Sequence, residues 1–183
     1  MVLAGGRATR FPGKLQAVFD GVPLLEHVVR NVSPAATQVV VAAQPADGPL
    51  GGLLAALAEV GERFVFVVAG DAPFVDAPIV RELASLWRAG DEAVVVAGVT
   101  GGPHRIEPLV ALYDSVALRR EGPAALAAGG SMLAAIAKLH ARFVLLDVAP
   151  HTLCNINTPA DLERALALLP PPENDAKGVT ERA

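Results

Sequence analysis

The sequence predicts an α/β fold in which a mainly parallel sheet is covered by helices on both faces. Short Val-rich runs alternate along the chain with Ala- and Leu-rich stretches of helical period, which is typical of such a sheet. Hydrophobic residues make up 52% of the chain but aromatic residues only 4%, so the core must be built from Ala, Val and Leu in closely packed layers. A length of 183 residues suits one domain.

Apolar runs and helical stripes give the order of the predicted elements. The predicted strands are 39–43, 63–69, 93–97, 109–113 and 143–148, the first three buried on both faces. The predicted helices are 23–32, 53–60, 77–87 and 132–139. The first of these helices carries one apolar stripe, formed by Leu24, Leu25, Val28, Val29 and Val32.

The two ends of the chain need separate interpretations. A buried strand should precede the Gly-rich turn at Gly5, yet only Met1, Val2 and Leu3 are available for it. Either that strand is very short or the true start codon lies upstream, and we favour the second. We expect the domain to span residues 1–169 and the polar tail 170–183 to be disordered.

Composition excludes several classes of function. The net charge is −4 and no block of Lys or Arg occurs, so no nucleic-acid partner is expected. The apolar runs are too short to cross a membrane, and no leader sequence is visible. Cys154 is the single cysteine; we interpret it as a buried, inert thiol of a cytoplasmic protein. His104 has no second His or Cys at metal-ligand spacing, which argues against zinc.

The Gly-rich segment near the start is the strongest candidate for a phosphate site. Gly5-Gly6-Arg7 follows the short first strand, and Arg10 and Lys14 follow on the same loop. Ligands of open α/β sheets bind beyond the carboxyl ends of the strands, where glycines let backbone N–H groups approach phosphate oxygens. The alternative is a glycine turn with solvated charges. The segment matches neither the P-loop nor the dinucleotide fingerprint.

Asp71 is the candidate metal ligand. It follows an apolar strand, and a carboxylate there is costly unless it is paired, hydrogen-bonded or bound to metal. Mg²⁺ uses one or two carboxylates together with substrate phosphates, so a single Asp suffices. The alternative is an Asp that caps the turn before Pro73.

Two further segments point to substrate binding. The turn 48–52 precedes the helix expected to begin near Leu53, and the N-terminus of that helix suits a phosphate or ribose oxygen. We expect Asp47 to lie close to the base of a bound nucleotide. In the second segment Thr158 is a good N-cap, Pro159 fits the first helical position and Asp161 suits the first turn. That leaves Asn155 and Asn157, whose alternation puts both amides on one face for substrate hydrogen bonds, with an Asx turn as the alternative.

Together these motifs resemble the molybdenum cofactor guanylyltransferase family, within the nucleotidyltransferase superfamily. The residues that carry the resemblance span most of the chain: Leu3-Ala4-Gly5-Gly6-Arg7, Lys14, the segments 20–25 and 48–50, Gly70-Asp71-Ala72-Pro73, the segment 108–113 and Asn155-Ile156-Asn157-Thr158-Pro159.

The resemblance implies a three-layer α/β/α, Rossmann-like nucleotidyltransferase fold and transfer of GMP from Mg²⁺-GTP to molybdopterin, with release of pyrophosphate. It implies nucleotide-binding residues Leu3, Ala4, Gly5, Gly6, Arg7 and Asp47, catalytic residues Lys14 and Asp71, and substrate-binding residues Arg10, Asn155 and Asn157. Lys14 would hold the phosphates and Asp71 the Mg²⁺. The implied partners are GTP or another NTP, molybdopterin, and molybdoenzymes or other cofactor-biosynthesis proteins.

The sequence departs from the family pattern at three places. Gly13 stands where the family usually has Asp, and Ala42, Ala43 and Gln44 stand where it has Asn. The stretch between Val41 and Gly48, which usually reads the base, is short. A related cytidylyltransferase or another NTP transferase with a different acceptor therefore stays open, as does a nucleotide-binding regulatory domain without catalysis.

Overall fold

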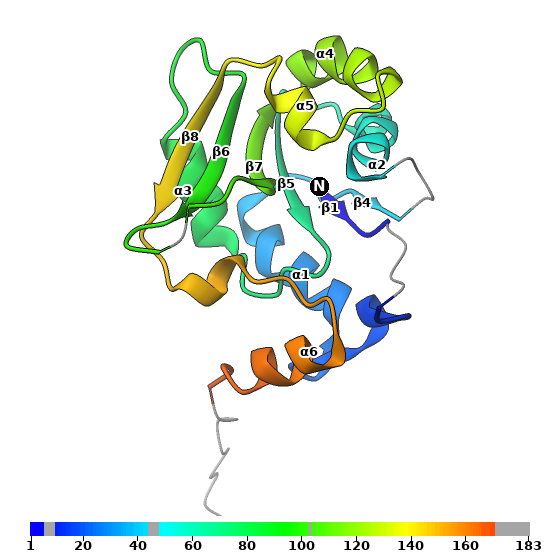
Figure 1. The fold of residues 1–183 in the computed structure, drawn as a ribbon, viewed down its shortest axis with the longest axis vertical. Helices are drawn as coiled ribbons and strands as arrows, with labels where there is room; N and C mark the ends of the chain where they lie inside the picture. The colour runs from blue at the N-terminus through cyan, green and yellow to red at the C-terminus, as the bar shows by residue number, and fades with distance from the viewer. Residues whose placement is uncertain (6–9, 44–47, 103, 171–183) are drawn as a thin grey trace, which may run out of the picture.

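Six strands form one mixed sheet in the computed structural model, which describes residues 1–5, 10–43, 48–102 and 104–170. Across the sheet the order is β4 (Val41–Ala42), β1 (Val2–Leu3), β5 (Phe64–Ala69), β7 (Glu107–Asp114), β6 (Ala93–Val99) and β8 (Ala141–Leu146) (Figure 1). β1 pairs in parallel with β4 and β5, and β6 with β8, whereas β7 is antiparallel to both its neighbours. The prediction of a mainly parallel sheet is confirmed, with β7 as the reversed strand.

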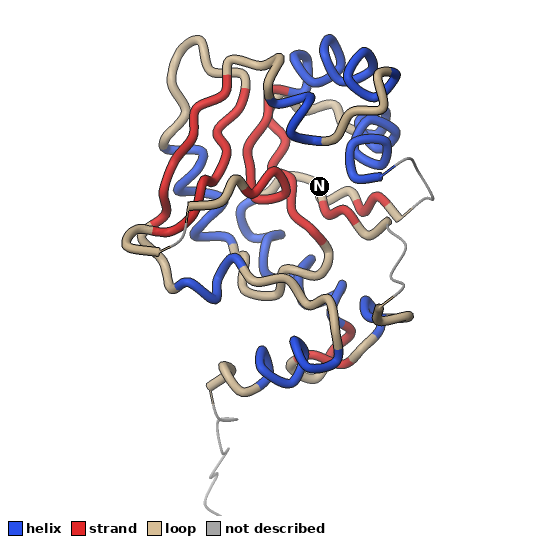
Figure 2. The backbone as a smooth tube through the Cα atoms, in the orientation of Figure 1, coloured by secondary structure: helices blue, strands red, loops and turns tan. Residues whose placement is uncertain are grey.

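Helices cover both faces of this sheet, so the three-layer architecture is confirmed (Figure 2). α2 (Gly48–Ala56), α4 (Ser115–Ala127) and α5 (Met132–Ile136) pack on one face, and α1 (Leu24–Val32) and α3 (Ala77–Ser85) on the other. The alternation of side chains along each strand produces the two layers. In β5, Val65 and Val67 join the first core, while Phe66 and Val68 join the second.

A smaller apolar cluster joins the start and the end of the chain. The hairpin of β2 (Val18–Phe19) and β3 (Val22–Pro23) packs with α6 (Pro159–Leu166) through Phe19, Leu24, Ile156 and Ala165. Its turn has positive φ at both Asp20 and Gly21 (51° and 77°), the type I′ geometry that Asp-Gly favours. This cluster fixes the segment around Ile156 against the first 25 residues.

Three predicted elements are wrong in detail. The segment 39–43 is not buried on both faces, because β4 is an edge strand of two residues and Val41 is 39% exposed. The helix expected from Leu53 begins at Gly48, so the glycines of 48–52 form its first turns. The helix expected over 132–139 ends at Ile136.

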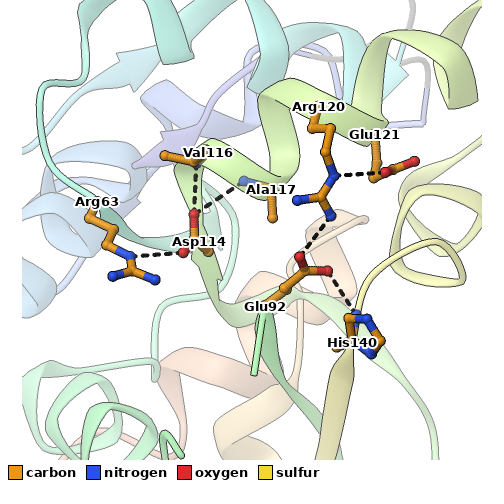
Figure 3. Close-up of polar contacts among 8 residues, drawn as sticks. All are labelled: Arg63, Glu92, Asp114, Val116, Ala117, Arg120, Glu121 and His140. Carbon is orange, nitrogen blue, oxygen red and sulfur yellow. Dashed lines mark hydrogen bonds and ion pairs between the residues drawn. The ribbon is translucent and has the colours of Figure 1, made fainter. Parts of the chain in front are cut away.

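Helix α4 was not predicted, and a polar cluster explains how it begins. The Asp114 carboxylate accepts hydrogen bonds from the N–H groups of Val116 and Ala117 (2.8 and 3.1 Å) and from Arg63 (2.9 Å) (Figure 3). Burial alone would raise the pKa of Asp114, but these hydrogen bonds outweigh it and the pKa lies below its usual value. The N-cap starts a helix that Gly122 and Pro123, in its interior, disguise in the sequence.

Beside this cap, Glu92 joins α4 to the segment before β8. Arg120 donates to its carboxylate (2.7 Å), and so does the backbone N–H of His140 (3.1 Å) (Figure 3). The Arg120 hydrogen bond is the main cause of a lowered pKa at Glu92. The tail 171–183 lies outside the described residues, and in the described part no helix is long and apolar enough to cross a membrane.

Candidate active site

The carboxyl ends of β1 and β5 lie side by side, and the chain leaves both through small residues. Leu3 pairs with Ala69, and the Gly70 N–H donates to the Leu3 carbonyl at 2.9 Å. A Cβ at Gly70 would lie 3.2 Å from that carbonyl oxygen and 3.1 Å from a Leu25 methyl group. A side chain at this position would therefore be tight against β1 and Leu25, and glycine allows the close approach of the two strand ends without any shift.

A cleft of about 230 Å³ opens at this edge of the sheet. Its walls come from six separate segments of the chain: Leu3, Ala4 and Gly5; Lys14 and Leu15; Pro49; Ala69 and Asp71; Leu109; and Asn155. Six of the residues that the sequence analysis singled out line this cleft: Leu3, Ala4, Gly5, Lys14, Asp71 and Asn155.

Lys14 is the centre of a hydrogen-bond network in this cleft. Its Nζ donates to Asp71 Oδ2 in an ion pair, to the Ile156 carbonyl (3.1 Å) and to Asn157 Oδ1 (3.2 Å). The Lys14 and Asp71 side chains are each 15% exposed. Lys14 is therefore not a solvated loop cation. Its contacts join the first loop to Asp71, just after β5, and to the 155–157 segment.

Gly13 provides the local backbone that starts the 3-10 turn Lys14–Gln16. Its φ is +72°, in the left-handed region that glycine adopts most easily. The departure from the family pattern at this position thus coincides with a backbone requirement of this chain.

Ile156 fixes the 155–157 segment beside the site. Ile156 is buried, and its N–H donates to the Asp71 carbonyl at 2.8 Å. Its exposed neighbours face the site: Asn155 lines the cleft and Asn157 accepts from Lys14. The alternation of the two amides around a buried Ile thus does bring both of them to the same site.

The helix that follows begins as the sequence predicts. Thr158 caps α6 in a reciprocal capping box with Asp161, and Pro159 occupies the first turn. The hydrogen bond from Thr158 is the largest cause of the lowered pKa of Asp161. Because Asp161 also accepts from the Asn157 N–H at 3.0 Å, the helix start fixes the backbone that carries the Asn157 amide.

A supporting network behind Asp71 was not predicted. His27 Nε2 lies 3.1 Å from the Pro73 carbonyl oxygen, and Asn31 Nδ2 donates to the same oxygen at 2.9 Å. Burial is the main cause of a lowered pKa at His27. The two residues stand four apart on α1, a spacing that places them on one helix face and is the sequence signal that could have been read.

Several predicted residues do not join the described site. Arg10 is exposed and does not line the cleft within the described ranges. Gly6, Arg7 and Asp47 lie outside the described residues, as does Gln44. The expectation for Cys154 is wrong, because this thiol is exposed.

The donor atoms suit a magnesium ion that is shared with a substrate. Among the described residues, no group of three or more His, Cys, Asp or Glu could hold a metal, and Asp71 is the acidic residue that lines the cleft. Mg²⁺ commonly takes one carboxylate and completes its shell with phosphates and water. The fit therefore requires a phosphate-bearing ligand in the cleft.

The comparisons with known proteins agree with this geometry. Residues 1–143 match the family model described as the MobA-like NTP transferase domain. A molybdenum cofactor guanylyltransferase of Cereibacter sphaeroides is 30% identical over 92% of this chain and 95% of its own length. One of Pseudomonas putida is 32% identical over 52% of this chain, and that match spans 61% of the relative's length.

A solved structure supports the same relationship. The molybdopterin-guanine dinucleotide biosynthesis protein A of Archaeoglobus fulgidus superposes with a TM-score of 0.73. It is 25% identical, and the match covers 91% of this chain and 95% of the other.

Proposed function

Because this nucleotidyltransferase belongs to the MobA-like NTP transferase family, we propose that it transfers GMP from GTP to molybdopterin and releases pyrophosphate. The observation that carries the proposal is the convergence of Lys14, Asp71 and Asn157 beside the Leu3–Gly5 backbone at the carboxyl end of β1 and β5. Ligands of open α/β sheets bind at this edge.

In the proposed reaction an oxygen of the molybdopterin phosphate attacks the α-phosphorus of GTP in line. A new phosphoanhydride bond forms, the bond from the α-phosphorus to its bridging oxygen breaks, and the electron pair leaves with pyrophosphate. Both reactants are anions, so the site must supply positive charge and alignment more than a strong base. We assign the fixed positive charge to Lys14 and the alignment of the acceptor to Asn155 and Asn157.

Asp71 is the residue we assign to Mg²⁺. When bound, the ion would neutralise charge on the phosphates. One oxygen of the carboxylate already meets Lys14, so Asp71 must share its charge between two cations or exchange one for the other. We propose that the Lys14 ammonium group turns from Asp71 toward the phosphates as the nucleotide enters.

We propose only modest selectivity for guanine. With Asp47 and Gln44 as the polar side chains proposed to reach the base, discrimination should be modest, because strong rejection needs polar groups that the wrong base leaves unpaired. We expect GTP to be preferred over ATP or CTP by roughly 1–3 kcal/mol, about one hydrogen-bonded contact.

The test is a pyrophosphate-release assay with each of the four triphosphates, Mg²⁺ and reduced molybdopterin. We expect release that requires molybdopterin and is fastest with GTP. A strict preference for CTP would assign the chain to a cytidylyltransferase instead. Triphosphate binding without pyrophosphate release from any triphosphate would contradict the proposed reaction and favour a nucleotide-binding regulatory domain.

A further inference from the structure

Helix α1 packs beside the turn that carries Asp71 (Figure 1). A Leu25 methyl group lies against Gly70, directly before Asp71. Two other side chains of the helix reach the carbonyl of Pro73, two residues after Asp71. α1 thus contacts the chain on both sides of the proposed metal ligand, although none of its described residues lines the cleft.

Asp71 lies in the first of two consecutive β-turns. The Ala72 N–H donates to the Ala69 carbonyl at 3.2 Å and closes the first turn, and the Val75 N–H donates to the Ala72 carbonyl at 3.4 Å and closes the second. Pro73 is the first central residue of the second turn, a position that its fixed φ suits. Because the two turns share the buried Ala72, the orientation of the first depends on that of the second.

The carbonyl of Pro73 belongs to a buried residue, and a buried carbonyl needs a hydrogen-bond donor. Among the described residues the donor side chains come from α1: Asn31 Nδ2 donates to this oxygen at 2.9 Å, and His27 Nε2 lies 3.1 Å from it. The two nitrogens are themselves 3.0 Å apart. Two side chains of one helix face therefore converge on a single oxygen atom of the turn.

The hairpin of β2 and β3 holds the His27 ring in place. The ring packs edge-on against the buried Phe19, with centroids 4.8 Å apart and an angle of 78° between the planes. Phe19 also contacts Phe74, the residue after Pro73, at 5.8 Å. His27 Nδ1 lies 3.9 Å from the exposed Asp20 carboxylate, a weak contact. Packing, more than charge, therefore fixes the ring nitrogen that faces Pro73.

This support matters most after the nucleotide has entered the cleft. In the described structure Lys14 holds the Asp71 carboxylate. Under the proposed function the ammonium group moves to the phosphates, so the carboxylate faces the metal without that partner. Its direction then depends on the backbone that carries it. That backbone is held by the Ile156 N–H, which donates to the Asp71 carbonyl at 2.8 Å, and by α1 through the Pro73 carbonyl.

We propose that Asn31 and His27 are positioning residues for the metal ligand: by holding the Pro73 carbonyl they fix the direction of the Asp71 carboxylate when Mg²⁺ and nucleotide are bound. The inference rests on the proposed assignment of Asp71 to Mg²⁺. Side chains that orient a metal ligand without touching the metal change metal affinity or activity by about 10–100-fold when they are removed. Because this support acts through the backbone two residues away, we expect the lower end, about 10-fold.

A purely structural role of the two side chains would have a different signature. A buried carbonyl that loses its donor destabilises the fold wherever it lies. Ser115 offers a matched case, because its Oγ donates to the Glu62 carbonyl at 2.8 Å, at the opposite end of β5 from the cleft. Loss of that hydrogen bond should lower stability without any effect on a metal held by Asp71.

The experiment measures Mn²⁺ binding, with Mn²⁺ as the probe for the Mg²⁺ site because both ions take oxygen ligands. The protein is saturated with a GTP analogue in which a methylene group joins the α and β phosphorus atoms, so that no pyrophosphate can leave. Free Mn²⁺ is followed by electron paramagnetic resonance. The wild type is compared with Asn31→Leu, His27→Phe, His27→Gln, Ser115→Ala and Asp71→Asn.

We expect Asn31→Leu and His27→Phe to bind Mn²⁺ about 10-fold more weakly than the wild type. His27→Gln keeps a nitrogen near the position of Nε2 and should recover most of the affinity. Ser115→Ala should lose as much Tm as Asn31→Leu, roughly 3–8 °C, and yet bind Mn²⁺ like the wild type. In turnover, Asn31→Leu should need about 10-fold more Mg²⁺ for its half-maximal rate, with an unchanged KM for molybdopterin.

Wild-type Mn²⁺ affinity in Asn31→Leu and His27→Phe, with a loss in Asp71→Asn, would overturn the positioning role and leave the assignment of Asp71 intact. An equal loss in Ser115→Ala would also overturn it, because the effect would then follow from stability alone. No loss in Asp71→Asn would overturn the proposed metal ligand and this inference with it. If Asn31→Leu does not fold, equal affinities of His27→Phe and His27→Gln would overturn the proposal.

Discussion

The two ends of β1 and β5 differ in what they gather. At the carboxyl end a cleft of about 230 Å³ collects Lys14, Asp71 and Asn155 from separate parts of the chain. At the amino end a groove of about 800 Å³ is lined mainly by aliphatic and aromatic residues. The smaller hollow holds the convergent charges, so chemistry, and not size, marks the candidate active site of this sheet.

The difference follows from how the strands end. Parallel strands place the loops that follow them at one edge, and here those loops carry the glycines, the lysine and the aspartate. At the other edge the same strands begin among apolar side chains of α1 and α3. Substitutions at the two ends should therefore affect different properties.

The largest expected effect is that of Lys14→Ala. Removal of the fixed positive charge should lower kcat by about 10²–10³-fold, the usual cost of one electrostatic contact to developing charge. The variant should also lose about 1–3 kcal/mol of stability, because the partly buried Asp71 carboxylate keeps no cation. Steady-state kinetics and thermal unfolding measure the two effects.

Lys138→Ala is the matched control, since Lys138 is exposed and lies in the segment after α5. It should change neither kcat nor Tm. If Lys14→Ala keeps full turnover, the assignment of Lys14 to the phosphates is wrong.

Asp71→Asn should reduce turnover by about 10²-fold at ordinary Mg²⁺ concentrations. Asn keeps the shape of the side chain but not the charge that holds a cation. Part of the activity should return as Mg²⁺ is raised, which a titration of activity against Mg²⁺ measures. Asp147→Asn, at an exposed position, is the control. Ordinary activity of Asp71→Asn at low Mg²⁺ would show that Asp71 only supports the turn.

Substitutions of the two asparagines should affect different kinetic parameters. Asn157 contacts Lys14, so Asn157→Ala should lower kcat, by roughly 10-fold for the loss of one hydrogen bond of about 1 kcal/mol or slightly more. Asn155 lines the cleft, so Asn155→Ala should mainly raise the KM for the acceptor. Identical effects of both substitutions on kcat and KM would contradict this division.

The smallest effect on activity is expected at the cap of α4, far from the cleft. Asp114→Ala should cost about 0.5–2 kcal/mol of stability and leave kcat unchanged. The lowered pKa of Asp114 means that its stabilisation is present above the unfolded pKa and is lost as the pH falls through the folded pKa. Wild-type stability should therefore fall below about pH 4 more steeply than that of Asp114→Ala, which chemical unfolding at several pH values measures.

The sequence predicted the elements whose causes lie within a few residues better than those that depend on distant parts of the chain. The apolar run of β5 and the Thr158 cap of α6 are readable because their causes lie within a few residues. By contrast, β4 becomes an edge strand only through its place in the sheet. The Asp114 cap of α4 is local, but Gly122 and Pro123 inside the helix hide it, and the Arg63 that pairs with Asp114 stands some fifty residues away.

The same distinction applies to the site. Residue types at strand ends indicated Lys14 and Asp71 as candidates, but not that they form an ion pair. Ile156, buried in the small cluster with Phe19, hydrogen-bonds to both partners, through its N–H to the Asp71 carbonyl and through its carbonyl to Lys14. Packing of this kind joins distant segments and leaves no pattern within either one.

Binding of Mg²⁺-GTP to variants of the two ends is the most direct test of the central claim. Calorimetric titration would compare the wild type with two variants. Lys14→Ala changes the carboxyl end, and Ala36→Trp changes an exposed residue that lines the groove at the amino end of β1 and β5. We predict that Lys14→Ala loses most of the affinity and Ala36→Trp keeps it. Retained affinity in Lys14→Ala together with lost affinity in Ala36→Trp would contradict the assignment of the nucleotide to the carboxyl end.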